Sequence, residues 1–217
     1  MEEKYLFEKY VKRGDIVYDI GANVGNTVAQ FVNLGASKVY AFEPSPNNFP
    51  KLEANTLNWP VVCYNVALHN RNYSCQTQFK DCATDFLDSN GKKQDTVQEI
   101  TYAVLDNFIL ARGIPDPQII KMDIEGMEGL VMNTMERYLT KVRPIIFLEI
   151  HAQPKDLDNQ NYLDNPHFTY PEDGGFDFNK LKDYGYSIEH SDGSLAPDSE
   201  DWNPKSGTHA MWILKPR

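Results

Sequence analysis

Long apolar segments are missing from this chain of 217 residues. No run approaches the ~20 apolar residues that a helix needs to span a bilayer. The N-terminal stretch MEEKYLFEKYVKRGD is charged throughout and lacks the apolar segment of a signal peptide. We therefore expect a cytoplasmic protein that does not contact membranes.

Cysteine and basic residues are both scarce. The three cysteines, Cys63, Cys75 and Cys82, are odd in number and show no CxxC spacing, which excludes a disulfide framework or a cysteine-based zinc site. The 21 Lys and Arg residues stand against 31 Asp and Glu residues, and the formal net charge is −10. Because nucleic-acid binding depends on clustered Lys and Arg, we expect no nucleic-acid partner.

The GxGxxG fingerprint of dinucleotide-binding proteins is also missing. Residues 19–25 instead read DIGANVG, in which two glycines follow a carboxylate and Asn23 replaces the central glycine that would admit a pyrophosphate. A carboxylate at Asp19 would repel phosphates and attract an ammonium group. The pattern favours a ligand with a ribose and an amino acid but no phosphate, and S-adenosylmethionine is such a ligand.

The surrounding stretch, residues 15–43, reads as strand, glycine turn, helix and second strand. A nucleotide-like ligand would lie over Gly21 and Gly25, and Glu43 would accept hydrogen bonds from its ribose hydroxyls. The alternative is an ordinary strand-to-helix turn, in which the glycines serve only close packing.

Strands and helices alternate along most of the chain, which predicts a single α/β domain over residues 1–217 with a mostly parallel sheet. A hairpin closes the domain. Irregular insertions are expected at about 69–98, 152–175 and 191–207. Apolar periodicity predicts strands at 16–20, 38–42, 61–68, 118–122, 144–150, 186–189 and 209–214, and helices at 26–34, 104–112, 128–139 and 176–184.

Carboxylates and a histidine follow two of these strands. Asp123 and Glu125 come after the strand at 118–122, and Glu149 and His151 after the next one. Since carboxyl ends of neighbouring parallel strands meet at one sheet edge, these side chains are expected to converge. His151, oriented by a carboxylate, or an acid of the pair Asp123 and Glu125 would accept a proton from a hydroxyl.

Plainer explanations exist for parts of this pattern. Glu128 would simply favour the N-terminus of the helix that it begins, and His151 would be a surface residue at a strand end. The cluster would also suit a divalent metal, but no ligand spacing is diagnostic, so we predict none.

Taken together, these motifs resemble the FkbM-type family of S-adenosylmethionine-dependent methyltransferases. The resemblance covers about residues 14–151, and its DIGAN and DIEGxE pair is fairly specific in this order. It is carried by DIGANVGN at 19–26, FEPSPNNF at 42–49, NVAL at 65–68, KMDIEGMEGLV at 121–131 and PIIFLEIH at 144–151.

The resemblance implies the class I methyltransferase fold, a Rossmann-like three-layer sandwich with a mostly parallel seven-stranded sheet and an antiparallel last strand. It implies O-methylation of a hydroxyl on a sugar or small metabolite. From the strand-end pattern described above, Asp123, Glu125 and His151 are expected to be catalytic. In the resemblance, Asp123 would lie near the methionine end of the cofactor. The cofactor would contact Asp19, Gly21, Asn23, Gly25, Asn26, Glu43, Pro44, Ser45, Asn65, Val66, Ala67 and Asp123.

Two other functions compete with this interpretation. A nicotinamide-dependent oxidoreductase shares the strand–turn–helix unit, but it should show GxGxxG and no acid at the strand end. A non-catalytic relative that binds a ligand or a partner would keep the fold without the chemistry. The acceptor, expected to be a small molecule or carbohydrate, would contact the residues after 151, where no motif identifies it.

Overall fold

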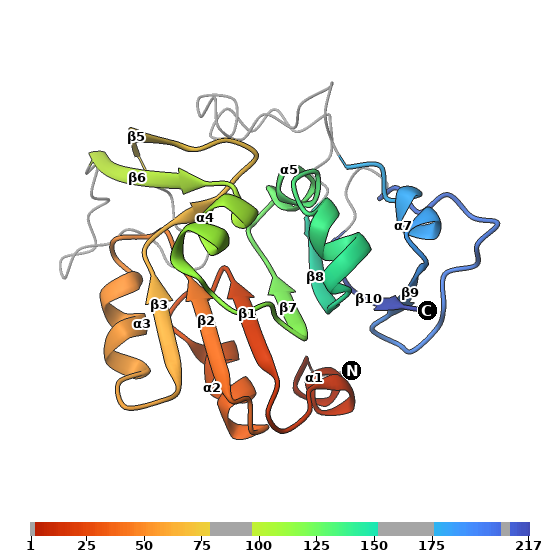
Figure 1. Ribbon diagram of the computed structural model, residues 1–217, viewed down its shortest axis with the longest axis horizontal. Coiled ribbons are helices and arrows are strands. Elements are labelled where there is room, and N and C mark those ends of the chain that lie inside the picture. The colour runs from red at the N-terminus through yellow and green to blue at the C-terminus, as the bar shows by residue number, and fades with distance from the viewer. Residues whose placement is uncertain (1–2, 79–96, 152–175, 205–208) are drawn as a thin grey trace.

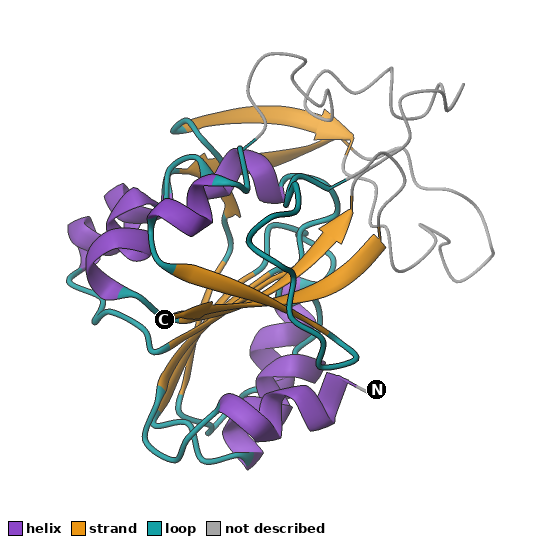
Figure 2. Cartoon of the chain, turned by 90° about the vertical axis from the view of Figure 1, so that its right-hand side faces the viewer, coloured by secondary structure: helices purple, strands orange, loops and turns teal. Residues whose placement is uncertain are grey.

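The computed structural model describes residues 3–78, 97–151, 176–204 and 209–217, and its centre is a seven-stranded sheet with helices on both faces (Figure 1, Figure 2). The strand order is β3-β2-β1-β7-β8-β10-β9. β10 runs antiparallel to both neighbours and the other pairs are parallel, which confirms the predicted sheet. The strands are β1 (Ile16–Ile20), β2 (Lys38–Phe42), β3 (Val61–Tyr64), β7 (Ile119–Met122), β8 (Ile145–His151), β9 (Tyr186–His190) and β10 (His209–Pro216).

The two sheet faces carry separate apolar layers because successive strand residues point to opposite sides. One face packs against α1 (Glu3–Tyr10), α2 (Asn26–Asn33) and α3 (Phe49–Asn55). The other face packs against α4 (Leu105–Arg112), α5 (Glu128–Met132), the π-helix η1 (Tyr138–Val142) and α7 (Lys180–Asp183). No helix in the described parts of the chain is long and apolar enough to cross a bilayer.

The predicted strand at 61–68 is wrong in one respect, because the chain turns at Asn65. The side-chain amide of Asn65 donates to the carbonyl oxygens of Glu43 and Pro44, at 2.9 and 3.1 Å, and so ends β3. The next residues form β4 (Ala67–Leu68) in a second, three-stranded sheet with β5 (Tyr73–Gln78) and β6 (Val97–Ala103), in the order β4-β6-β5.

The predicted helix at 128–139 is also interrupted. α5 ends at Met132, and Thr134 Oγ1 then donates to the carbonyl oxygen of Val131 at 2.8 Å. Such local hydrogen bonds from a threonine compete with helix continuation. The helix predicted at 176–184 is similarly shorter, since only α7 forms there.

The three predicted insertions differ from one another. The first contains β5, paired antiparallel with β6, and its residues 79–96 lie outside the described residues. The second, 152–175, lies outside the described residues. Of the third, residues 191–204 are described, and this part has an isolated bridge between Glu189 and Leu195 but no helix or strand.

A buried carboxylate connects the N-terminal helix to the sheet edge. Glu189 in β9 is only 3% exposed and accepts hydrogen bonds from Lys9 at 2.6 Å and Lys215 at 2.5 Å. Burial alone would raise the pKa of Glu189, but the two lysines outweigh it and lower the pKa to about 2. Because the pKa in the folded state is below the ordinary value of 4.5, ionised Glu189 stabilises the fold above pH 4.5, and this contribution is lost as the pH falls toward 2.

We expect Glu189→Gln to lower the free energy of unfolding by about 1–3 kcal/mol near pH 7, because two lysines lose their charged acceptor. The difference from the wild type should shrink between pH 4.5 and pH 2, where the wild-type carboxyl itself protonates. Urea denaturation across this pH range measures both effects. The exposed Glu53→Gln serves as control, and a Glu189→Gln deficit that stays constant down to pH 2 would contradict the assignment.

Gly21, directly after β1, lies very close to Asp123, the residue that follows β7. Its φ is +83°, and a Cβ there would lie 1.8 Å from the carbonyl oxygen of Asp123. The backbone N–H groups of Gly21 and Ala22 both donate to the carbonyl oxygen of Phe42 at 3.0 Å, so the turn is also tied to β2. Only glycine can adopt this left-handed backbone and also lie so close to the carbonyl oxygen of Asp123.

Gly14 provides a matched test, because its φ is +95° but a Cβ there would meet no atom within 4 Å. We expect Gly14→Ala to cost about 1–2 kcal/mol for the left-handed backbone alone. Gly21→Ala should cost about 1–3 kcal/mol more, since β1 and β7 must also move apart. Urea denaturation of both variants compares these costs, and equal losses would show that the close contact is unimportant.

Candidate active site

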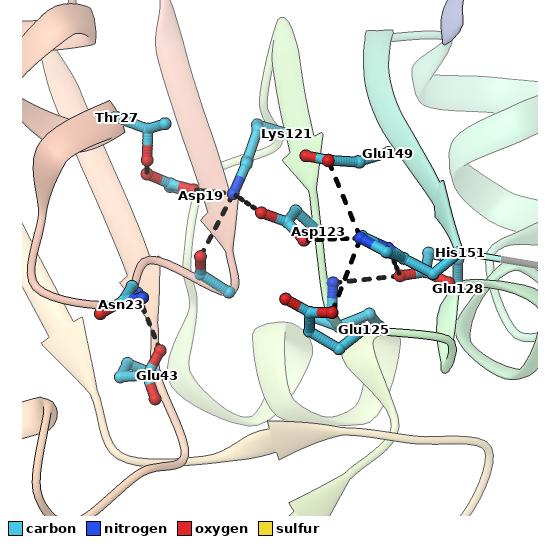
Figure 3. A network of polar contacts seen from close by, with 12 residues as sticks. Asp19, Asn23, Thr27, Glu43, Lys121, Asp123, Glu125, Glu128, Glu149 and His151 are labelled. Atoms are coloured by element: carbon cyan, nitrogen blue, oxygen red, sulfur yellow. Dashed lines mark hydrogen bonds and ion pairs between the residues drawn. The ribbon is translucent and has the colours of Figure 1, made fainter. Parts of the chain in front are cut away.

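The candidate active site lies at the carboxyl ends of β1, β2, β7 and β8, as predicted for an open parallel sheet. Asp19 in β1 is fully buried and in register with Lys121 in β7. Thr27, in the first turn of α2, donates a hydrogen bond to Asp19 Oδ2 (Figure 3). Burial raises the pKa of Asp19, and the charge of Lys121 and the hydrogen bond from Thr27 oppose this rise.

Lys121 is a buried cation that the sequence analysis did not assign to the site. Its Nζ lies 3.2 Å from the carbonyl oxygen of Gly21, 3.2 Å from Asp123 Oδ2 and 3.7 Å from Asp19 Oδ1. It therefore connects the glycine turn after β1 with the residue that follows β7. The sequence signal that could have identified Lys121 is its position between Ile120 and Met122, in an otherwise apolar strand.

Glu43 holds the turn from the side of β2. One oxygen of its carboxylate accepts the backbone N–H of Asn23 and the other that of Ser45, both at 2.8 Å. Asn23 adopts a left-handed backbone with φ +51°, which asparagine tolerates better than most residues. The structure thus brings these three predicted cofactor residues together in one hydrogen-bonded unit.

The remaining predicted cofactor residues flank this unit. Asn65 is bonded to the carbonyls of Glu43 and Pro44, and it leads into buried Val66 and into Ala67 at the start of β4.

Gly25 and Asn26 occupy the start of α2. Gly25 has φ +97°, and a Cβ there would lie 3.1 Å from Leu52 Cδ1 in α3. Close packing between α2 and α3 therefore also accounts for a glycine here, as in the alternative of an ordinary strand-to-helix turn. Asn26 is the first residue of α2.

Glu128 has a more specific role than the predicted effect on a helix terminus. It is 2% exposed, and its Oε1 accepts the backbone N–H groups of Ile124 and Gly126, both at 3.1 Å. The same oxygen lies 3.3 Å from Nδ1 of His151. Glu128 therefore fixes the loop after β7 and orients the imidazole ring.

His151 is 9% exposed, which excludes the alternative of an ordinary surface residue. Its Nε2 lies 3.6 Å from Glu125 Oε2, 3.7 Å from Glu149 Oε1 and 4.0 Å from Asp123 Oδ1. This confirms the predicted convergence of the two strand ends. Figure 3 shows the three carboxylates around the ring.

The surrounding carboxylates change the protonation of the ring. Burial alone would lower the pKa of His151, but the hydrogen bond with Glu128 and the negative charges around it raise the pKa to about 9. At neutral pH the ring is thus protonated. Burial raises the pKa of Glu125, and the charge of His151 counteracts this effect.

The site therefore consists of two connected parts. The first, around Asp19 and Glu43, surrounds the glycine turn. The second, the acidic cluster, consists of Asp123, Glu125, Glu149 and His151. Lys121 joins the two parts, and residues 152–175, where contacts to an acceptor were expected, lie outside the described residues.

Comparison with known proteins relates this geometry to a family. A family model described as "Methyltransferase FkbM domain" matches residues 19–188. The hexuronic acid methyltransferase AglP of Haloferax volcanii is 30% identical over 157 residues. This match covers 70% of the present chain and 63% of AglP, so the chain spans less than two thirds of that relative.

Solved structures show the same fold. Methyltransferase FkbM from Methylobacillus flagellatus superposes with a TM-score of 0.54 at 16% identity, over 92% of this chain and 43% of that one. Fibrillarin from Aeropyrum pernix, solved in complex with S-adenosyl-L-methionine, gives a TM-score of 0.50 at 14% identity. The superposition covers 98% of this chain and 73% of fibrillarin. With the family model matching most of its length, this chain belongs to the FkbM methyltransferase family.

Proposed function

We propose that this protein transfers a methyl group from S-adenosylmethionine to a hydroxyl oxygen of a carbohydrate. The observation that carries the proposal is the position of the glycine turn, held by Glu43 and Lys121, directly beside the acidic cluster. A cofactor on the turn would thus present its methyl group to an acceptor at the cluster. The hexuronic acid acceptor named for the similar archaeal enzyme makes acidic sugars the first class to test.

The residues of the turn suit the cofactor in charge and in hydrogen-bonding groups. Both oxygens of Glu43 accept backbone N–H groups of the turn, so its carboxylate is held where a ribose hydroxyl would donate to it. Asp19 is fully buried, so we assign it an indirect role: it holds Thr27 and Lys121 behind the turn. Asp123, with 28% of its side chain exposed, is the acid that a cofactor ammonium group would face.

In the reaction the S–CH₃ bond breaks with its electron pair on sulfur, and the acceptor oxygen forms the new bond to carbon. The cofactor supplies the electrophilic methyl group, and the protein supplies alignment, an effect worth up to ~7–11 kcal/mol. A carboxylate of Asp123 or Glu125 would accept the hydroxyl proton, with the ring of His151 beside them. Because His151 is already protonated at neutral pH, a neutral imidazole base is not the arrangement that this cluster favours.

Glu43→Gln tests the cofactor site. We expect the variant to weaken S-adenosylmethionine binding about 10–100-fold, because a charged acceptor of the turn and of the ribose is lost. Isothermal titration calorimetry with S-adenosylmethionine, its demethylated product and NADH measures this, with Glu53→Gln as surface control. Binding of NADH but not S-adenosylmethionine would instead support the oxidoreductase alternative.

Methyl transfer itself is tested with S-adenosylmethionine labelled in its methyl group. We expect label in glycans or sugars that contain hexuronic acids, bound through an ether oxygen. Cofactor binding without methyl transfer to any acceptor would favour the non-catalytic alternative. Label bound as a methyl ester of the uronic carboxyl group would instead overturn the hydroxyl acceptor.

A further inference from the structure

We propose that Asp123, Glu125 and His151 bind a divalent metal ion of the Mg²⁺ or Mn²⁺ type, which holds the acceptor hydroxyl beside the cofactor methyl group. The sequence analysis predicted no metal, because the spacing of these residues along the chain is not diagnostic. The inference rests on the proposed function for the role of the metal but not for its binding.

The donor atoms have the separations that a metal site needs. One oxygen from each acid and one ring nitrogen of His151 all lie within 4.8 Å of one another. The Nε2 to oxygen distances are 3.6 Å for Glu125 and 4.0 Å for Asp123. Around an ion with bonds of about 2.1 Å, neighbouring donors lie about 3 Å apart and opposite donors about 4.2 Å apart, so small side-chain movements would complete the site.

The second ring nitrogen of His151 provides an independent argument. Metal-binding histidines commonly donate their other N–H to a carboxylate, which fixes the tautomer and aims the free nitrogen at the metal. Glu128 Oε1 lies 3.3 Å from Nδ1 and is itself held by two backbone N–H groups. This buried carboxylate therefore directs Nε2 into the acidic cluster, as Figure 3 shows, and a bound ion would displace the proton that Nε2 carries in the metal-free protein.

The charge balance of the described residues points the same way. Lys121 and His151 contribute positive groups to this network. They face five carboxylates: Asp19, Asp123, Glu125, Glu128 and Glu149. The partly exposed carboxylates of Asp123 and Glu125 would repel an acidic sugar. A divalent cation compensates this charge and gives the acceptor oxygens a binding partner.

The backbone brings Glu125 into position at some conformational cost. Its φ is +56°, an uncommon value for a residue other than glycine, and Gly126 follows with φ +102°. This turn returns the Glu125 carboxylate toward His151, while 45% of the side chain stays exposed. An ion bound there would thus be open to an acceptor.

The donor set also limits the type of metal. Two carboxylates, one imidazole and no thiolate favour Mg²⁺ or Mn²⁺ over ions that select sulfur ligands. Such an ion would lower the pKa of a coordinated hydroxyl, so that its proton leaves to water as the oxygen attacks the methyl carbon. No oxidant or reductant is needed.

Mn²⁺ is the probe for the test, because its electron paramagnetic resonance signal reports binding directly. We expect the EDTA-treated full chain to bind Mn²⁺, and Glu125→Gln to raise the Kd at least tenfold. His151→Gln should have a similar effect and abolish the nitrogen coupling in pulsed spectra. Glu128→Gln should weaken binding about 10–100-fold while Asp123, Glu125 and His151 remain in place.

Two matched variants separate this proposal from the proposed function. Glu43→Gln should weaken S-adenosylmethionine binding and leave the Mn²⁺ affinity unchanged. Glu125→Gln should weaken Mn²⁺ binding and leave the S-adenosylmethionine affinity unchanged. Glu53→Gln should change neither, and thermal unfolding verifies that each variant is folded. Normal cofactor binding and methyl transfer in EDTA, without Mn²⁺ binding, would overturn the metal site and leave the proposed function intact. Mn²⁺ binding with nitrogen coupling from His151, but without cofactor binding, would support the metal site and overturn the proposed function.

Discussion

The site depends on one buried cation placed among acids of two adjacent strands. Lys121 is 2% exposed and reaches the Gly21 carbonyl, Asp123 and Asp19. A buried lysine is tolerated only when its charge is compensated, and buried carboxylates have the same need. Since each group stabilises the charged form of the other, the turn after β1 and the end of β7 are held as one unit. Asp19, which resembles a ligand-binding acid in the sequence, is in this respect an internal counter-ion.

Sheet register extends this constraint to the neighbouring strands. Asp19 pairs with Lys121 across β1 and β7, and Met122 pairs with Leu148 across β7 and β8. Because the strands are parallel and adjacent, the residues that follow them arrive at the same edge. Glu128 then fixes the final geometry by holding both the loop at 124–126 and the ring of His151. Backbone pairing thus brings the groups close, and side-chain hydrogen bonds set their orientation.

The sequence predicted those parts of the fold that depend on apolar periodicity. The strands of the large sheet, its antiparallel last strand and the convergence at Asp123 and His151 are of this kind. The break at Asn65 was missed because it depends on side-chain hydrogen bonds to carbonyls some twenty residues earlier. Lys121 and Thr27 were missed for a related reason. A polar residue in a strand or in a first helical turn reveals its partner only once the register between β1 and β7 is known.

The two parts of the site make different physical demands on a ligand. The glycine turn offers backbone groups and one carboxylate, Glu43, whose hydrogen bonds suit a neutral ribose. The acidic cluster combines like charges at short range, which raises the pKa of His151 and, together with burial, that of Glu125. Like charges at such distances disfavour each other's charged form, and a positive group nearby favours it. Asp123 lies at the boundary of the two parts, so a cation in the cluster would stand next to the transferred methyl group. Under the proposed function, the acceptor would be positioned by its oxygen atoms, and other segments of the chain would recognise the rest of the molecule.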